Sequence, residues 1–293
     1  MIQDKLKIKK ISIGMIINYG LLTLLVFICV YPFVNVLAYS LSGYNAVLSK
    51  RVTIFPVDIN LEAYHQILGK TQIWLSMRST VIVTAAGTFL SLILTLFAAY
   101  ALSRSYLPGQ KFFTVLILFT MYFGGGMIPT FMVVKGLGLY DSLAALYVPQ
   151  AVNVFNFIVM RTFFRGIPNE LEEAARIDGA SDLQILFRII IPLSLPVIAT
   201  IGLFYAVNYW NTYFDALLYI QSPDKYTLQL RLRGLLFAGE LNSSANIEGA
   251  AMPVMSQSLK MATVAVSTIP ILIVYPWLQK YFVKGVMLGS VKG

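Results

Sequence analysis

Six stretches without a charged side chain limit what this 293-residue chain can fold into. They cover residues 11–49, 79–103, 112–134, 142–160, 189–214 and 261–279. A helix needs about 20 apolar residues to cross roughly 30 Å of hydrocarbon, so each stretch can hold one membrane-spanning helix. The sequence predicts an all-α membrane protein, one domain over 1–293, with six transmembrane helices near 14–39, 79–102, 112–134, 142–164, 193–214 and 259–282.

The composition fits a membrane protein and argues against a nucleic-acid partner. Hydrophobic residues make up 58% of the chain and charged residues only 12%, whereas a soluble domain carries about 25% charged residues. The net charge is +9, but the basic residues are scattered between apolar runs and form no continuous stripe. Cys29 is the single cysteine of the sequence, so an intrachain disulfide is impossible.

The distribution of lysine and arginine predicts the orientation of the spans. If the N-terminus lies in the cytoplasm, 13 of the 22 basic residues fall on the cytoplasmic side, where membrane proteins concentrate them. Both termini and the loop 165–192 are then cytoplasmic. The segments 43–75 and 215–257 are expected on the outer side.

The cytoplasmic loop is a charged insert whose sequence predicts a helix, a turn and a second helix. Asn169 and Glu172 have the spacing of a capping box for the first helix, and Ser181 and Gln184 have it for the second. Gly179 stands where a left-handed residue would end the first helix. Such an insert suits contact with a soluble partner. The alternative is an amphipathic helix lying on lipid, which five acidic residues disfavour at an anionic surface: Glu170, Glu172, Glu173, Asp178 and Asp182.

Within this loop, the segment EAARIDGASDLQILFRIIIP (173–192) has a specific spacing. E-A-A is followed by three residues, G, nine residues, I, one residue, an aliphatic residue and P. This pattern resembles the EAA loop of permease subunits of binding-protein-dependent ABC importers, with Ile191 where the pattern usually has leucine. Five further segments are similar to the MalG/LplC-like branch for carbohydrates: YPFVNVLAYSLS (31–42), FPVDINLEAYHQIL (55–68), MYFGGGMIPTFMVVKGLGLYDS (121–142), IATIGLFYAVNYWNTYFDALLYI (198–220) and YFVKGVMLGSVKG (281–293).

The resemblance implies a type I ABC importer permease fold, with the EAA loop between helices four and five as the coupling element. It implies a heterodimer with a homologous permease, a dimer of ATPase subunits and an extracytoplasmic solute-binding protein, in the bacterial cytoplasmic membrane. ATP and Mg would be bound by the ATPase subunits. This chain, which lacks G-x-x-x-x-G-K-[ST], would bind no cofactor and be no enzyme. The residues implied for coupling to the ATPase are Glu173, Ala174, Ala175, Asp178, Gly179, Ala180, Phe187 and Pro192.

Polar and aromatic side chains inside the predicted spans are candidates for the solute pathway, because positions that face lipid are apolar. Amide groups can bind the hydroxyl groups of an oligosaccharide, and aromatic rings can stack on its sugar faces. The candidates are Tyr205, Asn208, Tyr209, Trp210, Asn211, Asn153 and Asn156. The alternative is that these side chains form hydrogen bonds with the partner permease or an aromatic belt at the membrane surface.

The run Gly124–Gly126 inside the third predicted span indicates a bent or closely packed helix near the pathway rather than a phosphate loop. One histidine, one cysteine and no clustered carboxylates outside the EAA loop predict neither a metal site nor a nucleophile.

Two other functions stay open from the sequence. The same machine could import a solute other than a sugar, or the chain could be a secondary transporter or membrane scaffold that needs no ATPase. The six charge-free stretches lack the acidic and basic groups expected for proton coupling, which argues against a secondary transporter.

Overall fold

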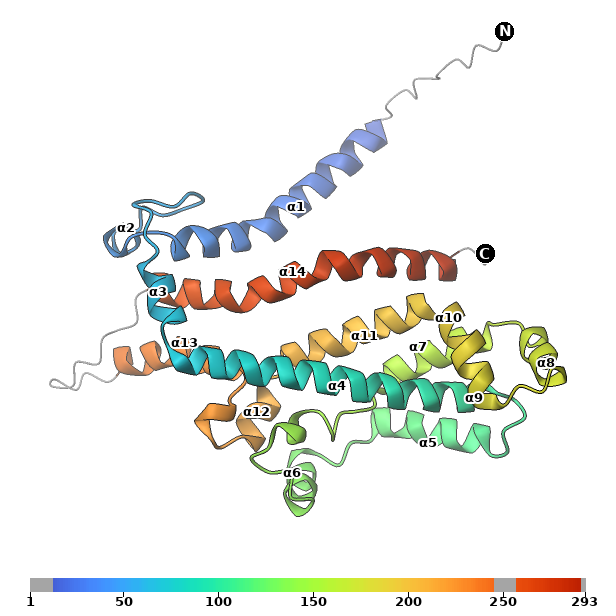
Figure 1. The fold of residues 1–293 in the computed structure, drawn as a ribbon. Helices are drawn as coiled ribbons and strands as arrows, with labels where there is room; N and C mark the ends of the chain where they lie inside the picture. Colours follow the sequence, from blue (N-terminus) through green and yellow to red (C-terminus); the bar gives the residue numbers. More distant parts are fainter. Residues whose placement is uncertain (1–12, 245–256, 291–293) are drawn as a thin grey trace, which may run out of the picture. The chain divides into compact units, whose positions relative to one another are not determined.

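A computed structural model describes residues 13–244 and 257–290, which are mostly helical and form no β-sheet. The Lys-rich N-terminal segment and residues 245–256, which belong to the segment expected on the outer side, lie outside the described residues. The chain divides into two units: residues 1–69 with 245–266, and residues 70–244 with 267–293. Figure 1 shows the helices with their labels.

The first unit contains α1, a long apolar helix, and the turn that follows it. Its elements are α1 (Ile13–Ser40), α2 (Tyr44–Leu48), α3 (Glu62–Leu68) and the start of α14 (Gln257–Ser290). Ala38 and Ser40 are the buried residues of α1, so most of its aliphatic surface is available to lipid or to another protein. Beyond its end, the Ser42 hydroxyl donates to the Ala38 carbonyl at 2.6 Å and accepts from the Val57 amide at 3.0 Å, which closes the turn.

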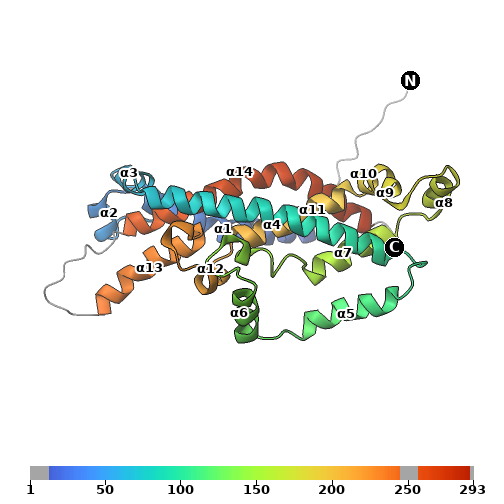
Figure 2. The same ribbon diagram turned by 60° about the horizontal axis from the view of Figure 1, so that its bottom comes forward.

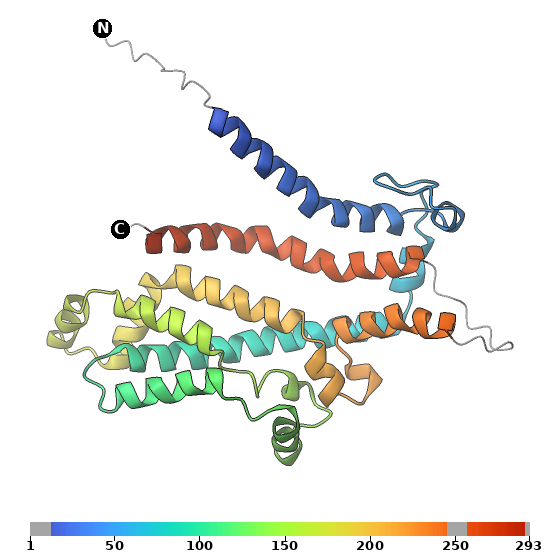
Figure 3. The same ribbon diagram turned by 180° about the vertical axis from the view of Figure 1, so that it is seen from behind.

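The second unit is built on α4 (Thr71–Ser103), which packs against α11 (Leu195–Trp210) and α7 (Val154–Arg165), as Figures 1 and 3 show. The buried face of α4 consists mainly of small and hydroxyl-bearing residues spaced three or four apart. They include Ser76, Thr80, Val83, Gly87, Ser91, Thr95 and Ala99. Small residues allow the close backbone approach on which helix packing in membranes depends.

Two tyrosines of α11 fill the contact with α4. The Tyr209 hydroxyl lies 2.8 Å from the Ser91 hydroxyl, and the Tyr205 hydroxyl lies 2.7 Å from that of Thr95. All four side chains are buried. Gly87 makes the approach possible, because a Cβ there would lie 2.8 Å from the Tyr209 ring and 2.9 Å from the Tyr147 Cβ.

The helix expected near 112–134 is interrupted. Two helices replace it, α5 (Gln110–Tyr122) and α6 (Met127–Gly136), with an angle of 115° between them (Figure 2). Gly126 has a φ of 83°, which glycine adopts without steric strain. The bend expected at the glycine run is thus present, and it is sharp enough to divide the helix.

The helix expected near 142–164 also differs from the structure. A 3-10 turn (η1, Leu143–Leu146) is followed by irregular chain, and α7 begins only at Val154. Pro149 lacks the amide hydrogen that a helix interior requires. The Asn153 side chain then accepts a hydrogen bond from the Asn156 amide at 3.1 Å and caps the new helix.

The remaining elements of the second unit follow α11. They are α12 (Phe214–Tyr219), a 3-10 turn (η3, Pro223–Lys225), α13 (Leu228–Ser244) and the rest of α14.

Length and composition qualify α1 and α4 as membrane-spanning helices among the described residues. The pair α5 and α6 could form one broken span, and so could Asp182–Leu193 with α11, which are bent by 83°; these pairs would bring the number to four. The described apolar part of α14 covers Gln257–Ile273. The six spans therefore stay a prediction.

Gly87→Ala tests the close contact between α4 and α11. The added methyl group must displace the Tyr209 ring or the chain at Tyr147, and overpacking of this kind costs about 1–3 kcal/mol. We expect a lower thermal unfolding midpoint in detergent.

Gly234→Ala is the matched control, because Gly234 is also helical and nothing lies within 4 Å of its added Cβ. Both changes gain helix propensity. Equal midpoints for the two variants would contradict the packing account.

Candidate functional site

The insert 165–192 forms two short helices joined by a tight turn. They are α8 (Glu170–Ile177) and α9 (Asp182–Ile185), and Figure 1 shows α8 beyond the end of α4. Gly179 has a φ of 83° just after α8, which confirms its predicted left-handed conformation. Ser181 and Gln184 form the predicted capping box, with hydrogen bonds of 3.4 and 2.8 Å.

The predicted capping box at Asn169 is wrong. The Asn169 side chain makes no capping hydrogen bond, and Glu172 is buried in an ion pair with Arg104. The local pattern assigned the Glu172 carboxylate to the start of α8, but the carboxylate binds Arg104, which is remote in the chain.

The second predicted helix continues toward Pro192, but with a change of winding. After α9 the chain forms a π-helical turn (η2, Leu186–Ile190) and then α10 (Ile191–Leu193). Pi-helical turns widen a helix by one residue and often occur at functional sites. Here the short helix α10 separates the turn from the bend into α11.

Most of the residues proposed for coupling are exposed. Glu173, Ala174, Asp178, Gly179, Phe187 and Pro192 are exposed, while Ala175 and Ala180 are partly buried against the core. Ile177 is 86% exposed, although it is a large apolar residue. We call Glu173, Ala174, Ile177, Asp178 and Phe187 the coupling surface. It combines small, apolar and acidic side chains that a soluble partner could cover.

A buried ion pair joins the inward face of α8 to the end of α4. The Arg104 guanidinium pairs with the Glu172 carboxylate, and the side chains are only 5% and 6% exposed. Burial raises the pKa of Glu172, and the positive charge of Arg104 opposes this shift. The Arg104 guanidinium also lies over the Tyr100 ring, 4.9 Å from its centroid.

Arg176 joins α8 to α9 on the more exposed side. Its guanidinium lies 2.5 Å from the Asp182 carboxylate and 2.6 Å from the Tyr106 hydroxyl. The Arg176 and Asp182 side chains are 41% and 55% exposed, so water screens their attraction. This pair orients the turn but contributes little to its stability.

Asp141 connects two loops of the second unit. Its carboxylate accepts hydrogen bonds from the Gln221 and Ser222 amides, both at 2.9 Å, and from Lys225 Nζ at 3.2 Å. The Ser222 hydroxyl donates a further bond. These hydrogen bonds hold the pKa of Asp141 well below its usual range, and the bond from the Ser222 hydroxyl has the largest effect. Asp141 has a φ of 56°, a conformation that aspartate tolerates better than most residues.

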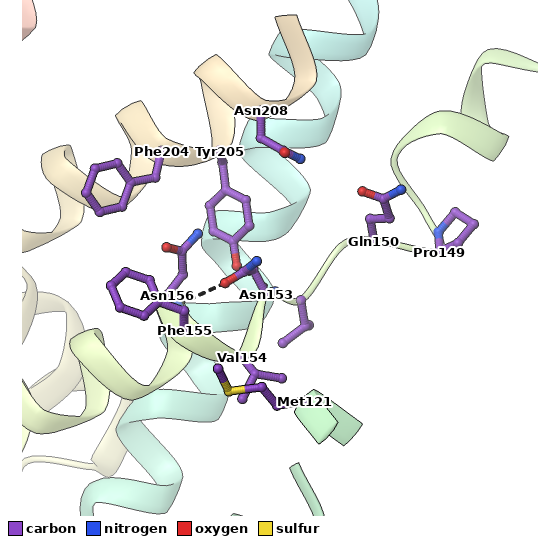
Figure 4. Close-up of a pocket in the computed structure, with 11 residues that line it drawn as sticks. Met121, Pro149, Gln150, Asn153, Val154, Phe155, Asn156, Phe204, Tyr205 and Asn208 are labelled. Atoms are coloured by element: carbon purple, nitrogen blue, oxygen red, sulfur yellow. Dashed lines mark hydrogen bonds between the residues drawn. The ribbon is translucent and has the colours of Figure 1, made fainter. Parts of the chain in front are cut away.

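A pocket of about 730 Å³ lies between α11 and the chain around the start of α7, with Met121 of α5 at its edge (Figure 4). Four of the residues proposed for the pathway line it: Asn153, Asn156, Tyr205 and Asn208. Gln150 lines it as well, and its amide donates to the Asp215 carboxylate at 2.6 Å. The lining combines amide, aromatic and aliphatic side chains, and contains no charged side chain.

The lining residues differ in the exposure of their side chains, and therefore in how well a ligand could reach them. Tyr205 is buried. Its hydroxyl accepts a hydrogen bond from the backbone amide of Asn153 at 3.0 Å, in addition to its contact with Thr95. Asn156 is buried too. The Asn153 and Asn208 side chains are exposed, and Figure 4 shows Asn153 beside the Tyr205 hydroxyl and Asn208 near the α11 end of the Tyr205 side chain. These two amides are the best placed to meet a solute.

The other three pathway candidates do not line this pocket. Tyr209 and Trp210 are buried, and the Tyr209 hydroxyl bonds to Ser91 of α4. The Asn211 amide group donates to the Val207 carbonyl at 2.8 Å, and its oxygen accepts from Gln229 at 3.4 Å. In this chain, these three side chains serve the packing of α11 and its neighbours.

Sequence reasoning missed the Arg104–Glu172 pair and the Asp141 contacts. Each joins residues that are far apart in the chain, so no local pattern signals it. The only hint was Arg104 itself, a cation directly after a long apolar helix.

Comparison with known proteins gives a family match over most of the second unit. Residues 91–288 match the family described as the binding-protein-dependent transport system inner membrane component. Among curated proteins, the chain is 47% identical over 276 residues to the polygalacturonan/rhamnogalacturonan transport system permease protein YtcP of Bacillus subtilis strain 168, covering 94% of this chain and 96% of that protein. It is 41% identical over 268 residues to protein LplC of the same strain, covering 91% and 90%.

A solved structure is similar over nearly the whole chain. It is a chain of a bacterial ABC transporter involved in the import of the acidic polysaccharide alginate, with 37% sequence identity and a TM-score of 0.83. The likeness covers 94% of this chain and 98% of that chain.

Asp141→Asn tests the contacts of the Asp141 carboxylate. Because the folded-state pKa is depressed, the ionised group stabilises the fold above its ordinary pKa of about 3.9, and this contribution is lost as the pH falls below that value. Weakening these bonds should lower the free energy of unfolding at pH 7 by about 1 kcal/mol. The difference from wild type should shrink as the pH is lowered from about 5 to about 3.

Asp224→Asn is the matched control, since Asp224 is exposed in the loop whose Ser222 and Lys225 bind Asp141. Thermal unfolding of the three proteins across this pH range gives the comparison. A difference between wild type and Asp141→Asn that does not change with pH would contradict the assignment.

Proposed function

This chain belongs to the family of binding-protein-dependent transport system inner membrane components, and we propose from this premise that it is a permease subunit of an ATP-driven importer for sugars or oligosaccharides. The observation that carries the proposal is the likeness over nearly the whole chain to a subunit of an alginate importer, at 37% identity. YtcP, at 47% identity, is also named for polysaccharide transport. The uncharged amides and aromatic rings of the pocket are suited to sugar hydroxyl groups and faces.

The coupling surface is proposed to contact an ATPase subunit. Its exposed apolar residues Ile177 and Phe187 would insert into the ATPase, while Glu173 and Asp178 would pair with cations at the rim. Gly179 and Ala180 keep the turn narrow enough for close approach. ATP and Mg would be bound by the ATPase dimer, and this chain would bind no cofactor.

In this proposal the chain forms half of the translocation pathway, and a homologous permease forms the other half. An extracytoplasmic binding protein delivers the solute. The exposed apolar surface of α1 is available to the second permease or to lipid. We place both termini and the coupling surface in the cytoplasm, and Asp141 with its loops on the outer side. The membrane is the bacterial cytoplasmic membrane.

Purification from the native membrane in mild detergent tests this assembly. We expect the tagged chain to be recovered with a second permease and an ATPase that carries a phosphate-binding loop, both identified by mass spectrometry. Ile177→Asp places a carboxylate where an exposed apolar contact is proposed and should reduce ATPase recovery about tenfold without loss of the second permease. Ile177→Leu should recover the ATPase normally. A wild-type chain recovered without any ATPase would overturn the proposal.

Asn208→Ala and Asn211→Ala form a matched pair that tests the pathway. Both remove an exposed asparagine at the end of α11, but Asn208 lines the pocket and Asn211 does not. Loss of a hydrogen bond to a solute costs about 0.5–1.5 kcal/mol, so Asn208→Ala should raise the solute concentration for half-maximal uptake about 2- to 10-fold. Asn211→Ala should leave it unchanged. Uptake of labelled oligosaccharides by cells gives the measurement, and an effect of Asn211→Ala alone would reject this pocket.

A further inference from the structure

We propose that the buried ion pair of Arg104 and Glu172 transmits movement of α8 to α4, which makes both residues positioning residues of the transport cycle. The inference rests on the proposed function, because α8 moves in this way only if an ATPase engages the coupling surface. It adds a route by which that movement reaches the pocket.

The first step of the argument is that α8 and α4 cannot separate at this point without a large cost. Arg104 and Glu172 are nearly inaccessible to water, at 5% and 6% exposure. Pulling a buried pair apart leaves two charges without compensation, which proteins tolerate poorly. An exposed pair such as Arg176–Asp182 could exchange its partner for water instead. The buried pair is therefore the contact that forces α8 and the end of α4 to move together.

The second step concerns the end of α4, which is held by two more helices. The Leu102 carbonyl, in the last turn of α4, accepts hydrogen bonds from Arg161 of α7 at 2.7 Å and from Gln110 of α5 at 2.6 Å. Carbonyls in the last turn of a helix have no partner within the helix, so they are free for such bonds. Movement of α8 thus arrives at a junction of α4, α5 and α7.

The third step leads from α4 to the pocket. Thr95, about two turns before the junction, bonds to Tyr205 of α11 at 2.7 Å. The same Tyr205 hydroxyl accepts a hydrogen bond from the backbone amide of Asn153 at 3.0 Å, and Tyr205 and Asn153 both line the pocket. Packed interiors transmit displacement because they compress little. A shift of α4 therefore displaces the wall of the pocket.

A merely structural role for the pair makes a different prediction. It would lower the yield or thermal stability of the variants, but the complexes that do assemble would respond normally to ATP. The experiment must therefore measure the response of the pocket wall in assembled complexes. Val152 is suited to this, because it lines the pocket and is 43% exposed.

The experiment uses the complete complex carrying Cys29→Ser and Val152→Cys. The rate of modification of the new thiol by a maleimide is measured without nucleotide and with ATP, Mg²⁺ and vanadate. The ratio of the two rates reports how far nucleotide moves the pocket wall. The ratio is then measured with Glu172→Gln, Arg104→Gln, the double change, and Arg104→Lys. Glu170→Gln, an exposed position on α8, is the matched control.

We expect Glu172→Gln and Arg104→Gln each to weaken the effect of nucleotide on the modification rate. The ratio of the two rates should then lie about 2- to 30-fold closer to one than in the parent complex. The double change should bring the ratio no closer to one than either single change does, because both single changes remove the same link. It also leaves no unpaired buried charge, so it remains measurable if a single variant fails to assemble. Arg104→Lys, which keeps the charge, and Glu170→Gln should respond nearly as the parent does.

Three results would overturn the inference. The parent ratio could equal one, the assembled double variant could respond like the parent, or the effects of the two single changes could simply multiply in the double variant. Each of these, in a complex that contains the ATPase, leaves the proposed function in place. Failure of the parent chain to recover an ATPase would instead overturn the proposed function, and this inference with it.

Discussion

The second unit depends on the close approach of α4 and α11. Water is absent from the bilayer core, so polar groups there must bond to one another, and helices gain little from hiding apolar surface. Ser91 and Thr95 meet this constraint by bonding to Tyr209 and Tyr205 across the contact. Gly87 brings the backbone close enough for these bonds to form. The pocket forms beside this contact, because the same Tyr205 hydroxyl also holds the chain at the start of α7.

Features decided by neighbouring residues could be predicted from the sequence. The left-handed Gly179, the capping box at Ser181 and the bend at the glycine run all follow from steric and hydrogen-bonding preferences within a few residues. The capping box at Asn169 failed for the opposite reason. Its carboxylate had a better partner in Arg104, which is remote in the chain, and nothing in the local pattern shows this competition.

The candidate pocket was predictable only in part. Polar residues inside apolar spans point to a pathway or to helix contacts, and spacing alone does not separate the two. Tyr205 and Tyr209 lie one turn apart on the same face of α11, where both reach α4, but Tyr205 also borders the pocket. The irregular chain before Val154 decides this difference, because it brings Asn153 to Tyr205. A continuous helix through Pro149 would have placed Asn153 elsewhere.

The junction at the end of α4 has a consequence for how such a chain can diverge during evolution. Its acceptor is the Leu102 carbonyl, a main-chain atom that every amino acid supplies. Residue 102 can therefore drift in identity without removing the acceptor, provided that the helix end stays in place. The donors, Arg161 and Gln110, have no such freedom, because their side chains make the bonds. Comparison of residue identities at position 102 would miss the junction, whereas retention of a side-chain donor at positions 110 and 161 would reveal it.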